Sequence, residues 1–170
     1  MSAFPLTRRA ALAGLGALVL PAMVEMGSAL AQPGLRIRAI KVDVSPIRAS
    51  MGDPTAAWVE EALPSALAQS LGPYMAPGDR NGATLVARID YLYLGPSSGG
   101  GGFFRRSQDT INGTLLLRGP RGVVANVPLR AITSYFPMAI DQTLVERALE
   151  GRVTALAQAF AGWAPRELGL

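Results

Sequence analysis

The residues best suited to contact another molecule are four consecutive side chains, Phe103, Phe104, Arg105 and Arg106. They follow four consecutive glycines in the segment 95–108, so we predict two aromatic rings and two guanidinium groups near the tip of a flexible loop. Exposed aromatic residues and arginines dominate protein interfaces, and basic aromatic tips suit anionic membrane surfaces. We therefore expect the tip to contact an envelope protein or a membrane surface. The alternative is that both phenylalanines fold back onto a sheet.

The composition excludes most catalytic and metal-binding chemistry. The 170 residues include no cysteine and no histidine, so thiolate nucleophiles, Ser-His-Asp triads and metal sites with His or Cys ligands cannot form. Asp43, Asp90 and Asp109 lie on predicted strands, and a pair of carboxylates would be a remaining route to hydrolysis. No spacing pairs them, and the run 79–81 has too few oxygen ligands for calcium. We predict no catalytic residue, no metal site and no cofactor.

The amino-terminal 31 residues have the pattern of a cleavable export signal. Arg8 and Arg9 precede an uncharged apolar run at 10–24, and Ala29 and Ala31 form a small-residue cleavage motif. The apolar run is shorter than the roughly 20 residues that a membrane span needs. Because the chain has no cysteine, we expect no bacterial lipid anchor of the cysteine type. We expect cleavage after Ala31 and a periplasmic mature protein.

The residues around the paired arginines carry a more specific resemblance. The run Thr7-Arg8-Arg9-Ala10-Ala11-Leu12 resembles the twin-arginine (Tat) signal, Ser/Thr-Arg-Arg-x-Phe-Leu-Lys. It departs from that pattern at Ala11 and Ala13, where Phe and Lys are usual. The resemblance implies that the Tat export machinery is a partner and that the protein folds before export. The general secretory route is the alternative.

The mature chain, residues 32–170, has a length typical of one domain. It carries 14 basic and 11 acidic residues, a net charge of +3, and Lys41 is its single lysine. A charge of this size is weak evidence for anionic partners. Nucleic acid is not expected as a partner, because export separates the protein from it and no dense basic helix is present.

The hydrophobic pattern predicts a two-layer α+β domain in the order β-α-β-β-β-α. The last three strands can form an antiparallel meander, and the first can add in parallel because a helix connects it to the next. We expect a four-stranded, mainly antiparallel sheet with two helices on one face. The predicted elements are strands at Leu35–Val44, Ala83–Leu94, Asp109–Arg118 and Val123–Ser134, and helices at Thr55–Leu71 and Gln142–Trp163.

Several local expectations accompany these elements. The run 119–122, Gly-Pro-Arg-Gly, predicts a hairpin turn, and Pro128 predicts an edge strand because it lacks a backbone donor. Alternation places Tyr91 and Tyr93 on the core face, so we expect them to pack in the core rather than stack on a ligand. The last helix is expected to end before Pro165.

The layout of the mature chain loosely resembles small periplasmic accessory domains of the bacterial envelope, found in several outer-membrane-lipoprotein and transporter-auxiliary families. The resemblance spans most of residues 35–163 but contains no specific motif, so it carries over no site residues. It implies a non-enzymatic binding or assembly role in the cell envelope. The alternative function is a His-independent hydrolase that uses Asp or Glu on envelope polymers.

Overall fold

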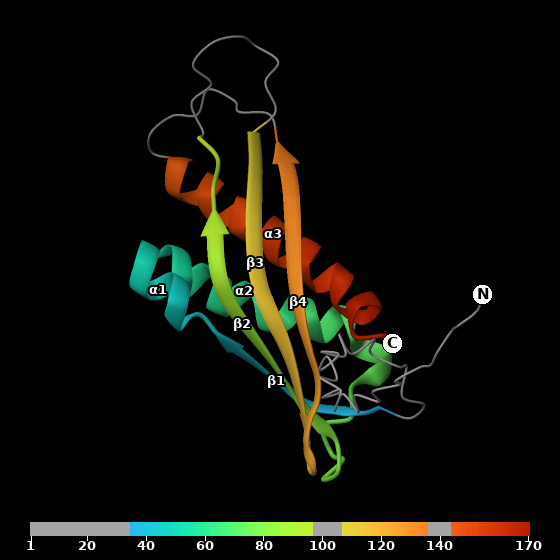
Figure 1. Ribbon diagram of the computed structural model, residues 1–170. Coiled ribbons are helices and arrows are strands. Elements are labelled where there is room, and N and C mark those ends of the chain that lie inside the picture. The colour runs from blue at the N-terminus through green and yellow to red at the C-terminus, as the bar shows by residue number, and fades with distance from the viewer. Residues whose placement is uncertain (1–34, 97–106, 136–143) are drawn as a thin grey trace, which may run out of the picture.

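Four strands form one sheet in the order β1-β2-β3-β4, which is also their order along the chain. The computed structural model describes residues 35–96, 107–135 and 144–170 (Figure 1). β1 pairs with β2 in parallel, and the two other pairs are antiparallel, as predicted. The strands are β1 (Ile37–Asp43), β2 (Ala83–Tyr93), β3 (Ser107–Gly119) and β4 (Gly122–Tyr135).

Three α-helices cover one face of this sheet, which confirms the two-layer α+β architecture (Figure 1). They are α1 (Ser45–Met51), α2 (Thr55–Ser70) and α3 (Val145–Glu167), and a short 3-10 turn, η1 (Gly72–Tyr74), follows α2. The prediction of two helices omitted α1. Pro46 stands in the first turn of α1, where its missing N–H removes no helical hydrogen bond.

A hydrogen bond at the start of α1 perturbs one carboxylate. The Ser45 N–H donates to Asp43 Oδ1 at 3.0 Å. The hydroxyl and the N–H of Ser45 together lower the pKa of Asp43, because both stabilise its charged form. Asp43 is therefore a turn residue at the end of β1 rather than a poised acid or base.

The core lies between the helices and the inward face of the sheet. Alternate residues of β2 and β3 point into it, and one stripe of α2 and one of α3 meet them. Phe160 on α3 is the largest of the fully buried side chains. The other large, fully buried side chains are Ile37, Ile47, Leu63, Leu67, Leu71, Leu85, Ile89, Ile111, Leu115, Leu117 and Leu156.

The connections follow from local chemistry. The helical crossover through α1 and α2 allows β1 to run parallel to β2, whereas Gly119 and Gly122 pair across a two-residue turn that joins β3 to β4. Gly122 has φ 128°, a conformation that favours glycine. Pro128 lies on β4, which is an edge strand as predicted.

The end of α3 differs from the expectation. The helix continues through Pro165 to Glu167, although a stop before the proline was predicted. Burial of Ala164 and Leu168 on the core side outweighs the one backbone hydrogen bond that the proline removes. The predicted helix start at Gln142 lies outside the described residues. In the described ranges, no helix is long and apolar enough to cross a membrane.

Candidate binding surfaces on the sheet

The face of the sheet opposite the helices has no element packed on it within the described residues (Figure 1). We call it the open face. It carries the side chains that alternate with the core residues, in rows that cross neighbouring strands. The rows contain Lys41–Val86–Leu116–Asn126, Asp43–Arg88–Thr114–Pro128, Tyr91–Asn112–Arg130 and Tyr93–Thr110–Ile132.

One end of the open face is aromatic. Tyr91, Tyr93 and Ile132 are 49%, 47% and 47% exposed, and we call these three residues the aromatic end. The prediction that the two tyrosines pack in the core was wrong. The register of β2 against β3 shifts between Ile89 and Tyr91, so Asp90 is an extra residue that moves everything after it to the other face.

Polar groups flank the aromatic end. Tyr91 pairs across the sheet with Asn112, which in turn pairs with Arg130 on the edge strand. The Asn112 side-chain oxygen is buried and accepts no hydrogen bond from the described residues. A half-exposed aromatic row next to an amide and a guanidinium is a typical protein-binding composition.

A buried ion pair lies behind this end, on the core side. Arg152 on α3 donates from Nε to Asp109 Oδ2 at 2.9 Å and from Nη2 to Asp109 Oδ1. Asp109 is 1% exposed and the Arg152 side chain 13% exposed. The pairing is bidentate, the geometry in which arginine binds a carboxylate most strongly.

The same pair holds the backbone beyond β2. Asp109 Oδ1 accepts the Gly95 N–H at 2.9 Å, and Arg152 Nη2 donates to the Gly95 carbonyl at 2.7 Å. The Ser107 hydroxyl donates to the Pro96 carbonyl at 3.3 Å. We call Asp109, Arg152 and Gly95 the clamp. It ties Gly95, two residues beyond the end of β2, to β3 and α3.

The three strand aspartates are not brought together. Asp109 belongs to the clamp, and Asp43 binds the start of α1. Asp90 pairs with Arg88 at 2.9 Å and accepts a hydrogen bond from Thr114 at 3.3 Å. Across the described ranges, no three acidic side chains gather closely enough to hold a metal ion.

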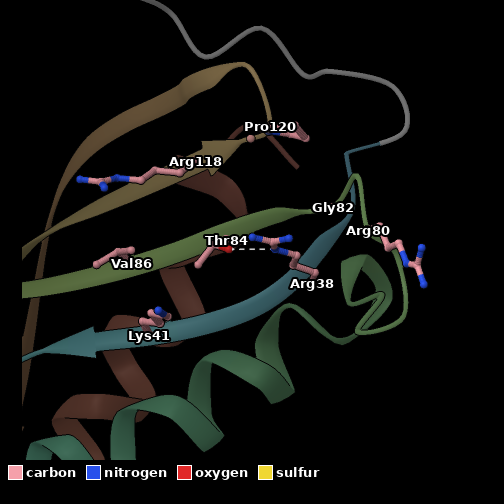
Figure 2. Close-up of a pocket in the computed structure, with 9 residues that line it drawn as sticks. Arg38, Lys41, Arg80, Gly82, Thr84, Val86, Arg118 and Pro120 are labelled. Carbon is pink, nitrogen blue, oxygen red and sulfur yellow. Dashed lines mark hydrogen bonds between the residues drawn. The ribbon is translucent and has the colours of Figure 1, made fainter.

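The other end of the open face is basic and hollow. A cavity of about 370 Å³ lies over the start of β2, between β1 and the end of β3 (Figure 2). Arg38, Lys41 and Arg118 project from β1 and β3 on either side of β2, and the guanidinium of Arg38 lies against Thr84 (Figure 2). We call it the basic pocket. Its lining is Arg38, Lys41, Arg80, Gly82, Thr84, Val86, Arg118, Gly119 and Pro120.

The contact residues predicted from sequence, Phe103, Phe104, Arg105 and Arg106, lie outside the described residues. The export-signal residues Arg8, Arg9, Ala29 and Ala31 lie outside them too.

The sequence interpretation missed the clamp, although a signal for it was present. Asp109 is in phase with the core face of its strand, with Ile111 two residues later. Arg152 is three residues after Leu149, within the apolar stripe of its helix. One acidic and one basic residue on two faces that both point into the core predict a buried pair.

Comparison with known proteins extends the description of the fold. No family model and no curated protein matches the sequence. The chain is similar in structure to a candidate lipoprotein from Caulobacter crescentus CB15, with a TM-score of 0.52 and 12% identity over 78% of this chain and 87% of that one.

Two further solved structures are similar at lower scores. A minor lipoprotein from Acinetobacter baumannii has a TM-score of 0.42 and 13% identity, covering 78% of this chain and 94% of its own. A DUF330 protein from Xanthomonas campestris has a TM-score of 0.44 and 17% identity, covering 81% of this chain and 88% of its own. At sequence identities this low, structural similarity is evidence for a shared fold and nothing more. Of the three structures named, the Caulobacter lipoprotein, with a TM-score above 0.5, supports the shared fold.

Proposed function

We propose that this protein is an exported, non-enzymatic accessory protein of the bacterial cell envelope that binds an envelope protein through the aromatic end of its sheet. The observation that carries the proposal is the exposure of Tyr91, Tyr93 and Ile132 at one end of the open face, with the tyrosines on β2 and Ile132 across β3 on β4. The sequence pattern of an export signal supports the location. The shared fold with a candidate lipoprotein supports a role in the envelope.

The chemistry of this end favours a protein partner over a lipid surface. Tyrosine buries a large ring at a small entropy cost and keeps a hydroxyl for hydrogen bonding. Arg88 and Asp90 precede Tyr91 on β2, and Arg130 lies in the same cross-strand row as Tyr91, so charges suited to a polar interface rim rather than a bilayer interior lie near the rings.

We extend the proposed contact to Phe103, Phe104, Arg105 and Arg106. The clamp supports this extension, since it anchors the backbone at Gly95, from which this segment departs. A fixed base lowers the entropy that such a segment loses when it binds.

A site-specific cross-linker tests the aromatic end directly. With a photoreactive phenylalanine analogue in place of Tyr93, we expect irradiation of cells to link the protein to one envelope protein. Tyr91→Ala in the same chain should reduce this product at least five-fold. The matched control is the analogue at Trp163, which is equally exposed at 47% but lies on α3 in the helical layer. It should give no such product.

The outcomes separate the possible surfaces. Cross-links from position 93 to lipid alone, or equal products from positions 93 and 163, would contradict the proposal. Once the partner is identified, its recovery with Phe103→Ala/Phe104→Ala tests the extension. Recovery equal to that of the wild type would exclude Phe103 and Phe104 from the interface and leave the aromatic end in place.

The hydrolase alternative gains no support from the described residues. The lining of the basic pocket contains no carboxylate, and the buried Asp109 is neutralised by Arg152. General acid-base hydrolysis requires two carboxylates that converge on one bond. We therefore do not propose it.

A further inference from the structure

We propose that the basic pocket is a binding site for a phosphate group carried by a small ester or by a lipid headgroup. The pocket lies at the opposite end of β2 from the aromatic end, so this inference does not depend on the proposed protein contact.

Positive charge is concentrated around the basic pocket. Arg38, Lys41 and Arg118 come from two strands on either side of β2 and border one hollow, with the guanidinium of Arg38 over β2 and that of Arg118 extended along β3 (Figure 2). Arg80 also borders the hollow, but its guanidinium extends away from it (Figure 2). Like charges around one hollow repel one another, so an arrangement without a counter-charge favours the uptake of an anion.

The basic pocket has no internal counter-ion among the residues that the structure describes. No carboxylate lines the basic pocket, and its four cations form no ion pair within residues 35–96, 107–135 and 144–170. The two aspartates of the open face are already bound elsewhere, Asp43 to Ser45 and Asp90 to Arg88.

The side chain of Arg38 is also oriented so that it can bind an anion. Its Nε–H donates to Thr84 Oγ1 at 3.2 Å, which directs the guanidinium over β2. Neither terminal nitrogen of Arg38 has a hydrogen-bond partner in the described part of the chain, so both remain for a ligand. Gly82 leaves room for this side chain, since a Cβ there would lie 3.1 Å from the Cβ of Arg38.

These features select the chemical class of the ligand. A guanidinium with two free terminal groups matches two oxygens of a phosphate, and a lysine adds a compact point charge. Val86 and Pro120 form an apolar part of the pocket wall. The hollow of about 370 Å³ has space for an organic group attached to the phosphate. We infer a phosphate ester held by Arg38, Lys41 and Arg118.

Two probes distinguish the source of the phosphate. The purified protein is titrated with sn-glycerol 3-phosphate by calorimetry, and its sedimentation is measured with vesicles of phosphatidylglycerol against vesicles of phosphatidylcholine. Calorimetric binding identifies a site for soluble esters. Binding to phosphatidylglycerol vesicles alone identifies a site for lipid headgroups. Either result supports the site, provided that the double variant Lys41→Gln/Arg118→Gln weakens that binding at least ten-fold.

The matched control removes equal charge outside the basic pocket. Arg130→Gln/Arg147→Gln also lowers the net charge by two, from exposed positions on β4 and α3 that do not line the pocket, and should leave binding within two-fold of wild type. Binding should also weaken as the salt concentration rises. Failure of both probes to bind, or equal loss in the control, would overturn the site. Circular dichroism spectra that match the wild type exclude misfolding as the cause of a loss.

Discussion

At the scale of single residues, the clamp is the most consequential feature. Charges are rarely buried unless paired, because removal from water costs several kcal/mol for each ion. Here the Asp109 carboxylate accepts two bonds from Arg152 and one from the Gly95 N–H, so its desolvation is offset by three hydrogen bonds. The pair specifies where β2 ends relative to α3.

Breaking the clamp on one side should strongly destabilise the protein. We expect Asp109→Asn to lower the free energy of unfolding by about 3–5 kcal/mol, because it leaves the buried Arg152 guanidinium without its counter-charge. Urea unfolding followed by circular dichroism measures this change. The control is Asp90→Asn, which removes an exposed ion pair with Arg88 and should cost about 1 kcal/mol or less. Equal losses of unfolding free energy in the two variants would show that the buried ion pair contributes no more to stability than the exposed one.

At the scale of elements, the β-bulge in β2 decides which side chains the protein presents. Ile89 pairs with Gly113 and Tyr91 with Asn112, so Asp90 is the unpaired extra residue between them. If Asp90 occupied its own position in the ladder, alternation from Ile89 would turn Tyr91 and Tyr93 to the core face. Because Asp90 is bulged out of the ladder, both tyrosines lie on the open face.

A deletion in β2 tests this account. Removing Asp90 should restore a regular ladder and leave Tyr91 and Tyr93 on the open face, because both already alternate correctly with Leu92. Nitration of the two tyrosines, measured by mass spectrometry, should match the wild type. Deletion of Leu92 is the matched control, since it moves Tyr93 to the core position. In that variant we expect protection of Tyr93 or loss of the fold; protection of both tyrosines after deletion of Asp90 would contradict the assignment.

At the scale of the whole molecule, the open face has two distinct ends. Thr84 in the basic pocket and Tyr93 in the aromatic end are nine residues apart on β2, or roughly 30 Å at about 3.3 Å per residue. The helices occupy the opposite face (Figure 1). The two proposed sites are therefore far enough apart to be occupied at the same time.

The export route is a property of the whole chain and has its own test. We expect Arg8→Lys/Arg9→Lys to retain the protein in the cytoplasm, because the Tat machinery reads paired arginines whereas the general secretory route needs only positive charge. Cell fractionation and immunoblotting of the cleaved form measure this. Unchanged export of the variant would assign the protein to the general secretory route.

Sequence by itself determined the order of the main elements, the antiparallel meander and the edge position of Pro128, because periodicity, turn residues and the missing proline donor act locally. Tertiary structure decided the surfaces. A one-residue bulge reverses the facing of a strand, and it could not be read from an alternation that already looked regular through Tyr93. The clamp joins residues 43 positions apart, and the basic pocket collects Arg38, Lys41 and Arg118. Only strand register and helix docking bring such distant charges together, because spacing along the chain does not measure distance across a sheet.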